Sequence, residues 1–208
     1  EAEEFEDESH KPKHNTEDTV GSVEFEHVRF AYPENPDRVI IKDFSAKVKP
    51  GQKVAIVGPT GAGKTTMVKL LCRLYDPTDG EILMDGINIK EYDYEQYMSV
   101  FAPVFQDFKL FAFRVTENLL RTDDITDEQR KVAEQTLKQV GIYDKLQTFP
   151  EGMDTVLFKY FDKGGIEPSG GEQQKLAIAR ALIKDADVVI LDEPTAALTP
   201  QEIKSLFK

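Results

Sequence analysis

One run of eight residues has the composition of a phosphate-binding loop: it reads Gly58-Pro59-Thr60-Gly61-Ala62-Gly63-Lys64-Thr65 and fits the pattern GxxxxGK(S/T). Its glycines let successive backbone N–H groups converge on one anion, which a β-carbon would obstruct. A helix that begins near Gly63 would add the positive end of its dipole. Lys64 can reach terminal phosphates as a point charge, and the Thr65 hydroxyl is a hard oxygen ligand for Mg²⁺. The alternative is a glycine-rich turn with a surface lysine, which the predicted flanking strand and helix disfavour.

Two acidic residues end the most strand-like run of the chain, Val188-Val-Ile-Leu-Asp192-Glu193. Ligands of a parallel sheet bind beyond the carboxyl ends of its strands, so both acids are expected on the same edge as the phosphate loop. Asp192 suits Mg²⁺ through a water molecule, and Glu193 suits the polarisation of an attacking water. Two acids that merely end a strand are the alternative, and the phosphate loop upstream disfavours it.

A second glycine-containing segment, Ser169-Gly170-Gly171-Glu172-Gln173-Gln174, opens the helix predicted before that strand. A serine cap, two glycines and a helix start together form an anion-binding corner. Taken alone, an ordinary N-cap with flexible glycines explains this segment better.

Together these segments resemble the nucleotide-binding domain of ATP-binding cassette (ABC) transporters, over essentially all of residues 22–208. The resemblance is specific because separate motifs occur in the family's order along the chain. They are Tyr32 before Pro33, the phosphate loop (Walker A), Gln106 after an apolar strand, the SGGEQ signature at 169–173, and the ILDEPT strand at 190–195 (Walker B).

The resemblance implies a role for each matching residue. Tyr32 would stack on adenine, and Gln106 would contact Mg²⁺ and the attacking water. Ser169 and Gly171 would bind the γ-phosphate of ATP held by the phosphate loop of a partner domain. An ordinary turn aromatic and a polar strand end remain the alternatives for Tyr32 and Gln106. The expected catalytic residues are Glu193, Gln106 and Lys64. The expected Mg²⁺ ligands are Thr65, Gln106 and Asp192. The expected ATP contacts are Tyr32, Gly58, Pro59, Thr60, Gly61, Ala62, Gly63, Lys64, Thr65, Thr66, Ser169, Gly170, Gly171 and Glu172.

The sequence departs from the family pattern at several points. Pro168 replaces the usual leucine, Glu172 stands where glutamine is common, and Thr199 occupies the usual aspartate of the D-loop. Residues 154–169, which in the family normally face coupling helices of the membrane part, include a few extra residues. The sequence also stops at Lys208, before the switch histidine of the family. We therefore expect the ATP site to be retained, and the 208-residue chain to hydrolyse ATP slowly.

The elements that must position these residues can be predicted from hydrophobic patterning. Val23–Phe30 alternates apolar and polar residues, and with Val39–Val48 it predicts an antiparallel β lobe. Val54–Val57 is a short apolar run typical of a buried parallel strand, and Lys64–Leu74 is predicted as a helix.

Further along, a hairpin is expected between Glu81 and Ile89 about Asp85-Gly86. Residues 101–105 are predicted as a strand, and 115–148 as helical. A capping box of Thr126 and Gln129 should start one of these helices, and Gly141 should end it. A further helix is predicted from about residue 171 to 184, before the strand that ends at Asp192. A helix is also expected to start at Thr199.

These elements predict an α/β fold: a P-loop NTPase core with a mostly parallel sheet, a small antiparallel β lobe and an inserted helical subdomain. Residues 1–21 are expected to form an acidic tail or linker, and 22–208 the nucleotide-binding domain, incomplete at its C-terminus. The lobe and core would comprise 22–91 and 181–208, and the helical subdomain about 92–180.

Composition limits the remaining possibilities. The formal net charge of −12 argues against nucleic acid as a partner, and half of it lies in residues 1–18, with eight acids against two lysines. The single cysteine, Cys72, excludes an internal disulfide and a cysteine-built metal site. No run of 18 apolar residues occurs, so no segment of the printed chain is expected to span a bilayer.

We therefore expect an ATPase that uses ATP and Mg²⁺, with a second nucleotide-binding domain and a transmembrane domain as partners. Such a domain would lie at the cytoplasmic face of the cell membrane. The acidic segment before Val23 resembles the linker that follows a fused membrane domain, which favours an exporter. A soluble ABC ATPase without a membrane partner, or a nucleotide-binding module without hydrolysis, remains the alternative.

Overall fold

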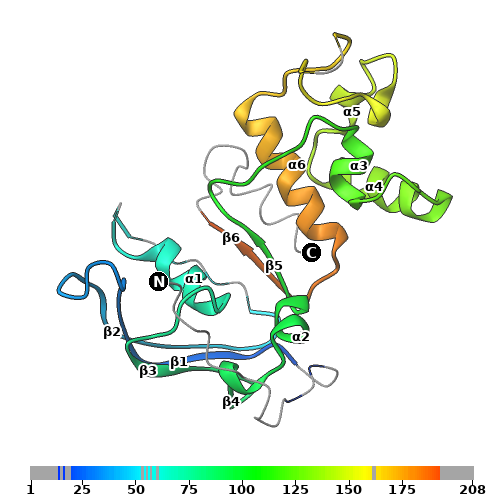
Figure 1. Cartoon of the computed structure of the whole chain (residues 1–208). Helices are drawn as coiled ribbons and strands as arrows, with labels where there is room; N and C mark the ends of the chain where they lie inside the picture. The colour runs from blue at the N-terminus through cyan, green and yellow to red at the C-terminus, as the bar shows by residue number, and fades with distance from the viewer. Residues whose placement is uncertain are drawn as a thin grey trace. The chain divides into compact units, whose positions relative to one another are not determined.

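The computed structural model is of mixed α/β type and forms two compact units, Glu1–Phe101 and Ala102–Lys208 (Figure 1). It describes residues 14, 16, 20–52, 54, 56, 58–59, 61–160 and 163–192. The expectations for the acidic tail before residue 14, for Thr60 and Glu193, and for the helix at Thr199 lie outside the described residues. The division into a core and a helical subdomain at residue 92 stays a prediction.

A four-stranded antiparallel sheet organises the first unit. Its strands are β1 (Val23–Ala31), β2 (Val39–Val48), β3 (Asp79–Met84) and β4 (Ile87–Asn88), in the order β2-β1-β3-β4. The predicted antiparallel lobe is therefore confirmed. The strand β1 has a β-bulge after Glu26, where His27 takes a φ of +48°. Because of this bulge, odd-numbered residues such as Phe25 are buried before it and even-numbered residues such as Val28 after it. Gly80 lies opposite this bulge, where a Cβ would come within 2.3 Å of the His27 carbonyl oxygen.

The predicted hairpin at Asp85-Gly86 is also confirmed. Both residues have positive φ, +51° and +81°, as the mirror-image turns between two hairpin strands require. The Asp85 carboxylate accepts hydrogen bonds from the backbone N–H groups of Val20, Gly21 and Ser22 at 2.9–3.2 Å, and from the Ser22 hydroxyl at 2.8 Å. Asp85 therefore fixes the segment that leads into β1.

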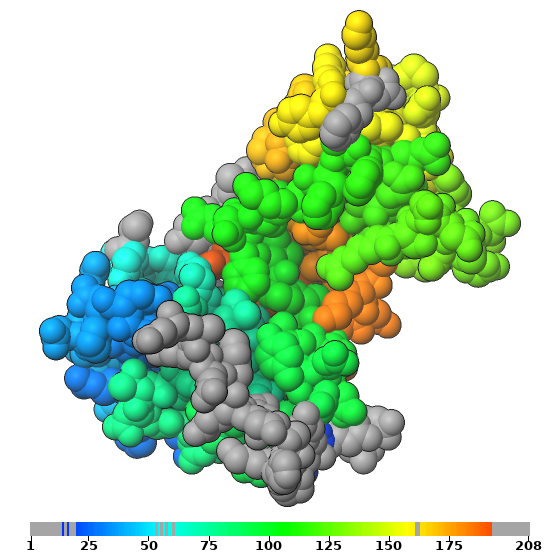
Figure 2. All heavy atoms as spheres, viewed as in Figure 1, coloured from blue at the N-terminus to red at the C-terminus, as the bar shows by residue number. Residues whose placement is uncertain are grey.

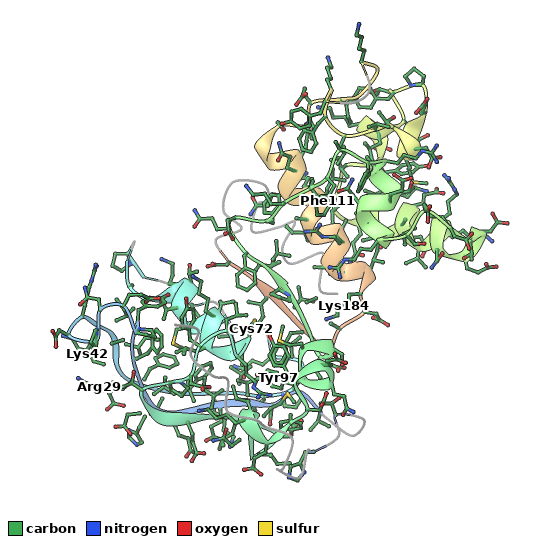
Figure 3. The ribbon with its side chains drawn as sticks, in the orientation of Figure 1. Arg29, Lys42, Cys72, Tyr97, Phe111 and Lys184 are labelled. Atoms are coloured by element: carbon green, nitrogen blue, oxygen red, sulfur yellow. The ribbon has the colours of Figure 1, made fainter. Side chains whose placement is uncertain are left out.

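Three short helical segments complete the first unit: α1 (Lys64–Leu71), the 3-10 turn η2 (Ile89–Glu91) and α2 (Tyr94–Ser99). The helix α1 ends three residues earlier than predicted, and Arg73 beyond it takes a φ of +52°. The Tyr97 hydroxyl donates to the Leu71 carbonyl at 2.6 Å, and Cys72 is fully buried as a small apolar residue. Figure 3 shows Tyr97 and Cys72 inside this unit, and Arg29 and Lys42 on its outside.

The structure differs from the prediction of a buried strand at Val54–Val57. Val54 and Ile56, the two described residues of this run, belong to no strand and are 53% and 48% exposed. A fully buried strand needs a hydrogen-bonded neighbour on each edge. Within the described part of the first unit, neither Val54 nor Ile56 pairs with a strand of the sheet β2-β1-β3-β4. The mostly parallel core sheet therefore stays a prediction.

The second unit combines helices with a two-stranded sheet of β5 (Phe101–Val104) and β6 (Val188–Leu191). The helix α6 (Gly170–Ile183) packs against α3 (Val115–Leu120) and α4 (Asp127–Gln139), and α5 (Tyr143–Leu146) and η3 (Gly152–Asp154) follow α4. Figure 2 shows the helical region of this unit as one continuous body, coloured from green to orange. Its core includes Val115, Leu119, Ala133, Leu137, Leu157, Leu176 and Ile178.

Local signals predicted both ends of α4 correctly, although the stretch 115–148 predicted as helical is divided into three helices, α3, α4 and α5. Thr126 and Gln129 form a reciprocal capping box at the start of α4. Gly141 lies two residues beyond the end of α4 with a φ of +70°, the conformation that favours glycine after a helix. Among the described residues, every helix is too short or too polar to cross a membrane.

Candidate nucleotide-binding site

The phosphate loop has a backbone that only glycine accommodates well at several positions. Gly61 and Gly63 take φ values of +81° and +89°, and Gly63 is the N-cap of α1. A Cβ on Gly63 would lie 3.2 Å from Cγ2 of Ile40, and one on Gly58 would lie 3.1 Å from Cβ of Ala62. The described part of the loop is thus a tight turn in which side chains at Gly58 and Gly63 would crowd their neighbours.

The start of α1 is suited to an anion. Its first turn, Lys64–Met67, contains no acidic residue, so its exposed N–H groups and positive dipole end are not offset locally. Nζ of Lys64 donates to the carbonyl oxygens of Gly58 and Pro59, at 3.0 and 3.2 Å. The lysine therefore lies across the loop, where its ammonium group can exchange these carbonyls for phosphate oxygens.

Tyr32 lies beside α1. Its hydroxyl is 3.1 Å from the Thr66 hydroxyl, and its ring makes edge-on contacts with Phe30 and Tyr75 at centroid distances of 5.0 and 5.1 Å. Nζ of Lys69 lies 5.9 Å from the centre of the ring. The first unit therefore brings the aromatic residue predicted to stack on adenine close to the helix that begins at the phosphate loop.

In the second unit, Gln106 and Asp192 follow two paired strands. The Asp192 backbone N–H donates to the Val104 carbonyl at 2.9 Å, so the carboxyl ends of β5 and β6 meet. Asp192 is 4% exposed, while Gln106, two residues beyond β5, is exposed. Gln106 and Asp192 thus follow the carboxyl ends of neighbouring strands. The predicted edge shared by Asp192, Glu193 and the phosphate loop stays a prediction.

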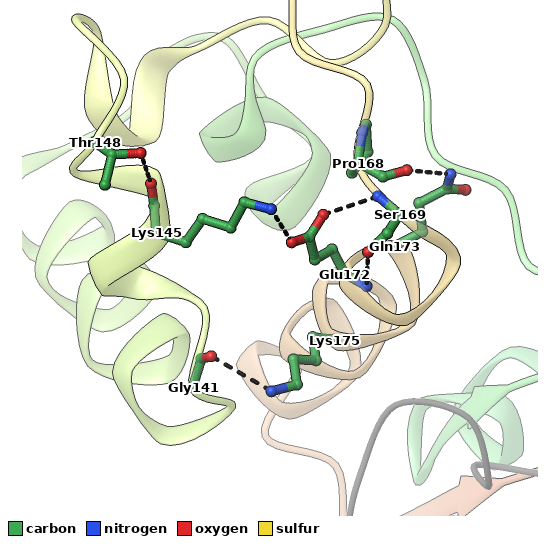
Figure 4. Close-up of polar contacts among 8 residues, drawn as sticks. All are labelled: Gly141, Lys145, Thr148, Pro168, Ser169, Glu172, Gln173 and Lys175. Carbon is green, nitrogen blue, oxygen red and sulfur yellow. Dashed lines mark hydrogen bonds and ion pairs between the residues drawn. The ribbon is translucent and has the colours of Figure 1, made fainter.

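The signature segment begins α6, and Ser169 is its N-cap. The Ser169 hydroxyl accepts from the Glu172 N–H at 3.4 Å, and the Glu172 carboxylate accepts from the Ser169 N–H at 2.8 Å. Glu172 also pairs with Lys145, and these bonds, led by that of Lys145, lower the pKa of its carboxyl group. Figure 4 shows these contacts together with the bond from Gln173 to the Pro168 carbonyl.

Asn118, which no motif in the sequence identified, orders the segment after Gln106. Its Nδ2 donates to the carbonyl oxygens of Phe111, Phe113 and Arg114 at 3.0–3.3 Å, and its Oδ1 accepts from the Phe111 N–H at 2.8 Å. Asn118 is 3% exposed, whereas Phe111 and Phe113 are 58% and 56% exposed and stack on each other. An asparagine within the apolar stripe of α3 was the only signal in the sequence.

Comparison with known proteins decides the family of this chain. The family model described as "ABC transporter" matches residues 41–196, which include the phosphate loop, Gln106, the signature segment and Asp192. The chain belongs to the ABC transporter family.

Relatives of this ABC chain are considerably longer proteins. It is 39% identical to the "ABC multidrug transporter mdr1" of Aspergillus fumigatus over an alignment of 188 residues. This alignment covers 90% of this chain and 14% of the relative. It is 41% identical to the "ATP-dependent lipid A-core flippase" of Paraburkholderia xenovorans over an alignment of 180 residues. This second alignment covers 86% of this chain and 29% of the relative. The chain thus spans only a minor part of either relative.

A solved structure has the same fold. The structure titled "Structure of a bacterial Atm1-family ABC exporter with ATP bound" aligns with a TM-score of 0.77 and 33% sequence identity, over 96% of this chain and 35% of that chain.

The described site residues of this ABC chain fall into two groups. The first unit contains Tyr32, the described part of the phosphate loop, Thr65 and Thr66, and the second contains Gln106, the signature residues 169–172 and Asp192. Thr60 and Glu193 lie outside the described residues, as stated above.

Proposed function

We propose that the chain is the ATP-binding and ATP-hydrolysing motor domain of an ABC exporter. The observation that carries this proposal is the phosphate loop, in which two glycines with positive φ lead into a helix start without acidic residues and Lys64 lies across the loop carbonyls. The titles of its relatives and of the similar solved structure name transporters, a flippase and an ATP-bound exporter. These titles support the same assignment for the domain.

In this proposal the residues of the first unit bind ATP. The backbone of Gly58–Gly63 and the N-terminus of α1 hold the phosphates, Lys64 binds the terminal phosphates, and Tyr32 stacks on adenine. The crowding that a Cβ would cause at Gly58 and Gly63, against Ala62 and Ile40, keeps the loop tightly turned, which supports its backbone N–H groups converging on one anion. Thr66, buried on α1, contributes through its contact with Tyr32.

Magnesium fits the chemistry of the proposed ligands. The Thr65 hydroxyl, the Gln106 side-chain oxygen and the Asp192 carboxylate are hard oxygen donors of the kind that Mg²⁺ prefers. When bound, Mg²⁺ neutralises negative charge on the phosphates. Glu193 would hold and polarise the attacking water, and Gln106 would orient it.

The proposed unit of action is a head-to-tail dimer. Ser169 and Gly171 of one domain would contact the γ-phosphate of ATP bound to the phosphate loop of its partner domain. A transmembrane domain would be the other partner, which places the motor domain at the cytoplasmic face of the membrane. The helix start at Ser169, with two glycines and an exposed hydroxyl residue, supports this assignment.

The test uses the full-length product of the gene that encodes this chain. Glu193→Gln should bind ATP as tightly as the wild type, lose turnover by a factor of about 100 or more and accumulate as an ATP-bound dimer, because the glutamine cannot accept the proton of the attacking water. Phosphate release and gel filtration with and without ATP measure both effects.

The control is Glu151→Gln, a change at an exposed glutamate, which should behave as the wild type. Normal turnover of Glu193→Gln would contradict the assigned role. ATP binding without turnover by the wild-type protein would favour a non-hydrolysing nucleotide-binding module.

A further inference from the structure

One carboxylate joins two segments of the second unit at the N-terminus of α6 (Figure 4). Oε2 of Glu172 accepts the Ser169 N–H at 2.8 Å, while Oε1 of Glu172 contacts Nζ of Lys145, a residue of α5. The backbone of Lys145 is itself held in a turn, because its carbonyl accepts from the Thr148 hydroxyl at 2.7 Å. The lysine thus connects an ordered turn to the cap of α6.

This contact lies in the wall of a pocket of about 250 Å³. The pocket wall combines the signature segment with two lysines: its residues are Gly141, Ile142, Lys145, Ser169, Gly171, Glu172 and Lys175. The side chain of Glu172 is only 20% exposed, and the Lys145 side chain covers it from the α5 side. The second lysine, Lys175, makes a different contact, a hydrogen bond to the Gly141 carbonyl at 3.4 Å.

Without Lys145, two groups at the N-terminus of α6 would have opposite effects on an incoming anion. A helix N-terminus with a serine cap and glycines attracts an anion. The Glu172 carboxylate caps the same turn and carries a negative charge of its own, which would repel an incoming phosphate. Lys145 contacts this carboxylate directly and offsets its charge. A carboxylate can therefore hold the Ser169 backbone while the corner still accepts an anion.

We propose that Lys145 is a positioning residue for the signature segment: it holds the Glu172 carboxylate in its capping geometry and neutralises it where the γ-phosphate of a partner domain's nucleotide is to bind. This inference rests on the proposed function of Ser169 and Gly171. It adds a residue outside the signature motif, on a separate helix, to the parts on which that function depends.

The first variant is Lys145→Met in the full-length protein, which keeps the length of the side chain and removes its charge. Leaving Glu172 uncompensated should raise the ATP concentration for half-maximal turnover by about threefold to tenfold, through like-charge repulsion at a partly exposed site. Lys138→Met is the matched control. Lys138 also pairs with a glutamate, Glu134, on the exposed surface of the same unit, and its loss should change this concentration by less than about twofold.

The second variant separates a charge effect from a structural one. Glu172→Gln retains a side-chain oxygen that can accept the Ser169 N–H but carries no charge. Added to Lys145→Met, it should restore the half-maximal ATP concentration to within about twofold of the wild type. Lys145→Arg, which keeps the positive charge, should also behave nearly as the wild type.

Two results would overturn the inference. One is a Lys145→Met protein that behaves like Lys138→Met. The other is a Lys145→Met defect that Glu172→Gln does not relieve, because direct contact of Lys145 with phosphate or a purely structural role would leave the defect in place.

A measurement on the 208-residue chain keeps this inference separable from the proposed function. The pKa of Glu172, followed by carbon NMR of its carboxyl group, should rise in Lys145→Met and stay unchanged in Lys138→Met. A wild-type protein that neither binds nor hydrolyses ATP would refute the proposed function, whereas an unchanged Glu172 pKa in Lys145→Met would refute the pairing itself.

Discussion

The hydroxyl of Tyr32 lies 3.1 Å from the hydroxyl of Thr66, which joins the turn after β1 to the buried side of the helix that follows the phosphate loop. Phe30 and Tyr75 contact the Tyr32 ring edge-on, so the ring is held from two sides. A ring fixed in this way can offer a face to a base at little further cost in side-chain entropy.

This arrangement predicts different effects for two substitutions of Tyr32. Tyr32→Ala should weaken the binding of a fluorescent ATP analogue by about fivefold to a hundredfold, since stacking of a base on an aromatic side chain contributes about 1–3 kcal/mol. Tyr32→Phe loses only the contact with Thr66 and should weaken binding by less than about fivefold. Tyr94→Ala removes an exposed tyrosine of α2 and serves as the control. Equal affinities of the Tyr32→Ala and Tyr94→Ala proteins would make Tyr32 a packing residue only.

Lys64 provides the most direct test of the phosphate loop. Lys64→Ala should reduce Mg·ATP affinity by about tenfold to a hundredfold or more, because charge-assisted hydrogen bonds to phosphate are lost. Lys42→Ala removes a lysine from the exposed side of β2 and should leave the affinity unchanged. Titration of both proteins with the same nucleotide analogue decides the matter, and unaltered binding by Lys64→Ala would refute the assignment.

Asp85 should make stability depend on pH. Burial alone would raise the pKa of its carboxyl group, but the hydrogen bonds from Ser22, Gly21 and Val20 outweigh burial and lower it. A lowered folded-state pKa stabilises the protein above the unfolded-state pKa, near 4 for an aspartate, and this contribution is lost as pH falls through the lower, folded-state pKa.

Asp85→Asn should therefore lower the free energy of unfolding at pH 7 by about 1–3 kcal/mol, since its amide N–H₂ group would face backbone donors. The difference from the wild type should shrink as the pH falls below about 4. Urea unfolding at several pH values measures it, with Asp37→Asn, a change in an exposed turn, as the control. A difference that is constant with pH would contradict the role of the ionised carboxylate.

Features set by a few neighbouring residues were predictable from the sequence. The turn at Asp85-Gly86 needs two positive φ values, and this pair of residues tolerates them. The capping box at Thr126 is likewise complete within four residues. These predictions succeed because the physical requirement and the residues that meet it lie in one short segment.

Features that depend on distant partners were not predictable in this way. The apolar pattern of Val54–Val57 predicts burial, but burial depends on which strands pair with the run, and the described Val54 and Ile56 are exposed. The contact of Lys145 with Glu172 spans 27 residues of sequence, and nothing in either segment alone specifies it. The same is true of the four hydrogen bonds, three from backbone N–H groups and one from the Ser22 hydroxyl, by which the Asp85 side chain holds residues 20–22.

Asn118 leads to the last prediction, which concerns the segment between β5 and α3. Its buried side chain bonds to four backbone groups of residues 111–114, and the three carbonyls among them also accept from backbone N–H groups. Asn118→Ala would remove the acceptor of the Phe111 N–H and one of the donors to each of three carbonyl oxygens. A buried backbone group that loses its hydrogen bond costs about 1–3 kcal/mol. We expect the free energy of unfolding to fall by about 1–3 kcal/mol, because the carbonyl oxygens keep their backbone donors and the main loss is the acceptor of the Phe111 N–H.

Asn118→Asp discriminates between the two halves of this network. Its carboxylate can still accept the Phe111 N–H but cannot donate to the three carbonyl oxygens, which it would instead repel. It should therefore destabilise the protein at least as much as Asn118→Ala at pH 7, and less at low pH, where the protonated acid regains one donor. Urea unfolding measures both variants against Gln135→Ala, a change at an exposed position of α4. If Asn118→Asp were instead as stable as the wild type at pH 7, the amide N–H₂ group would not be what holds the Phe111–Phe113 segment in place.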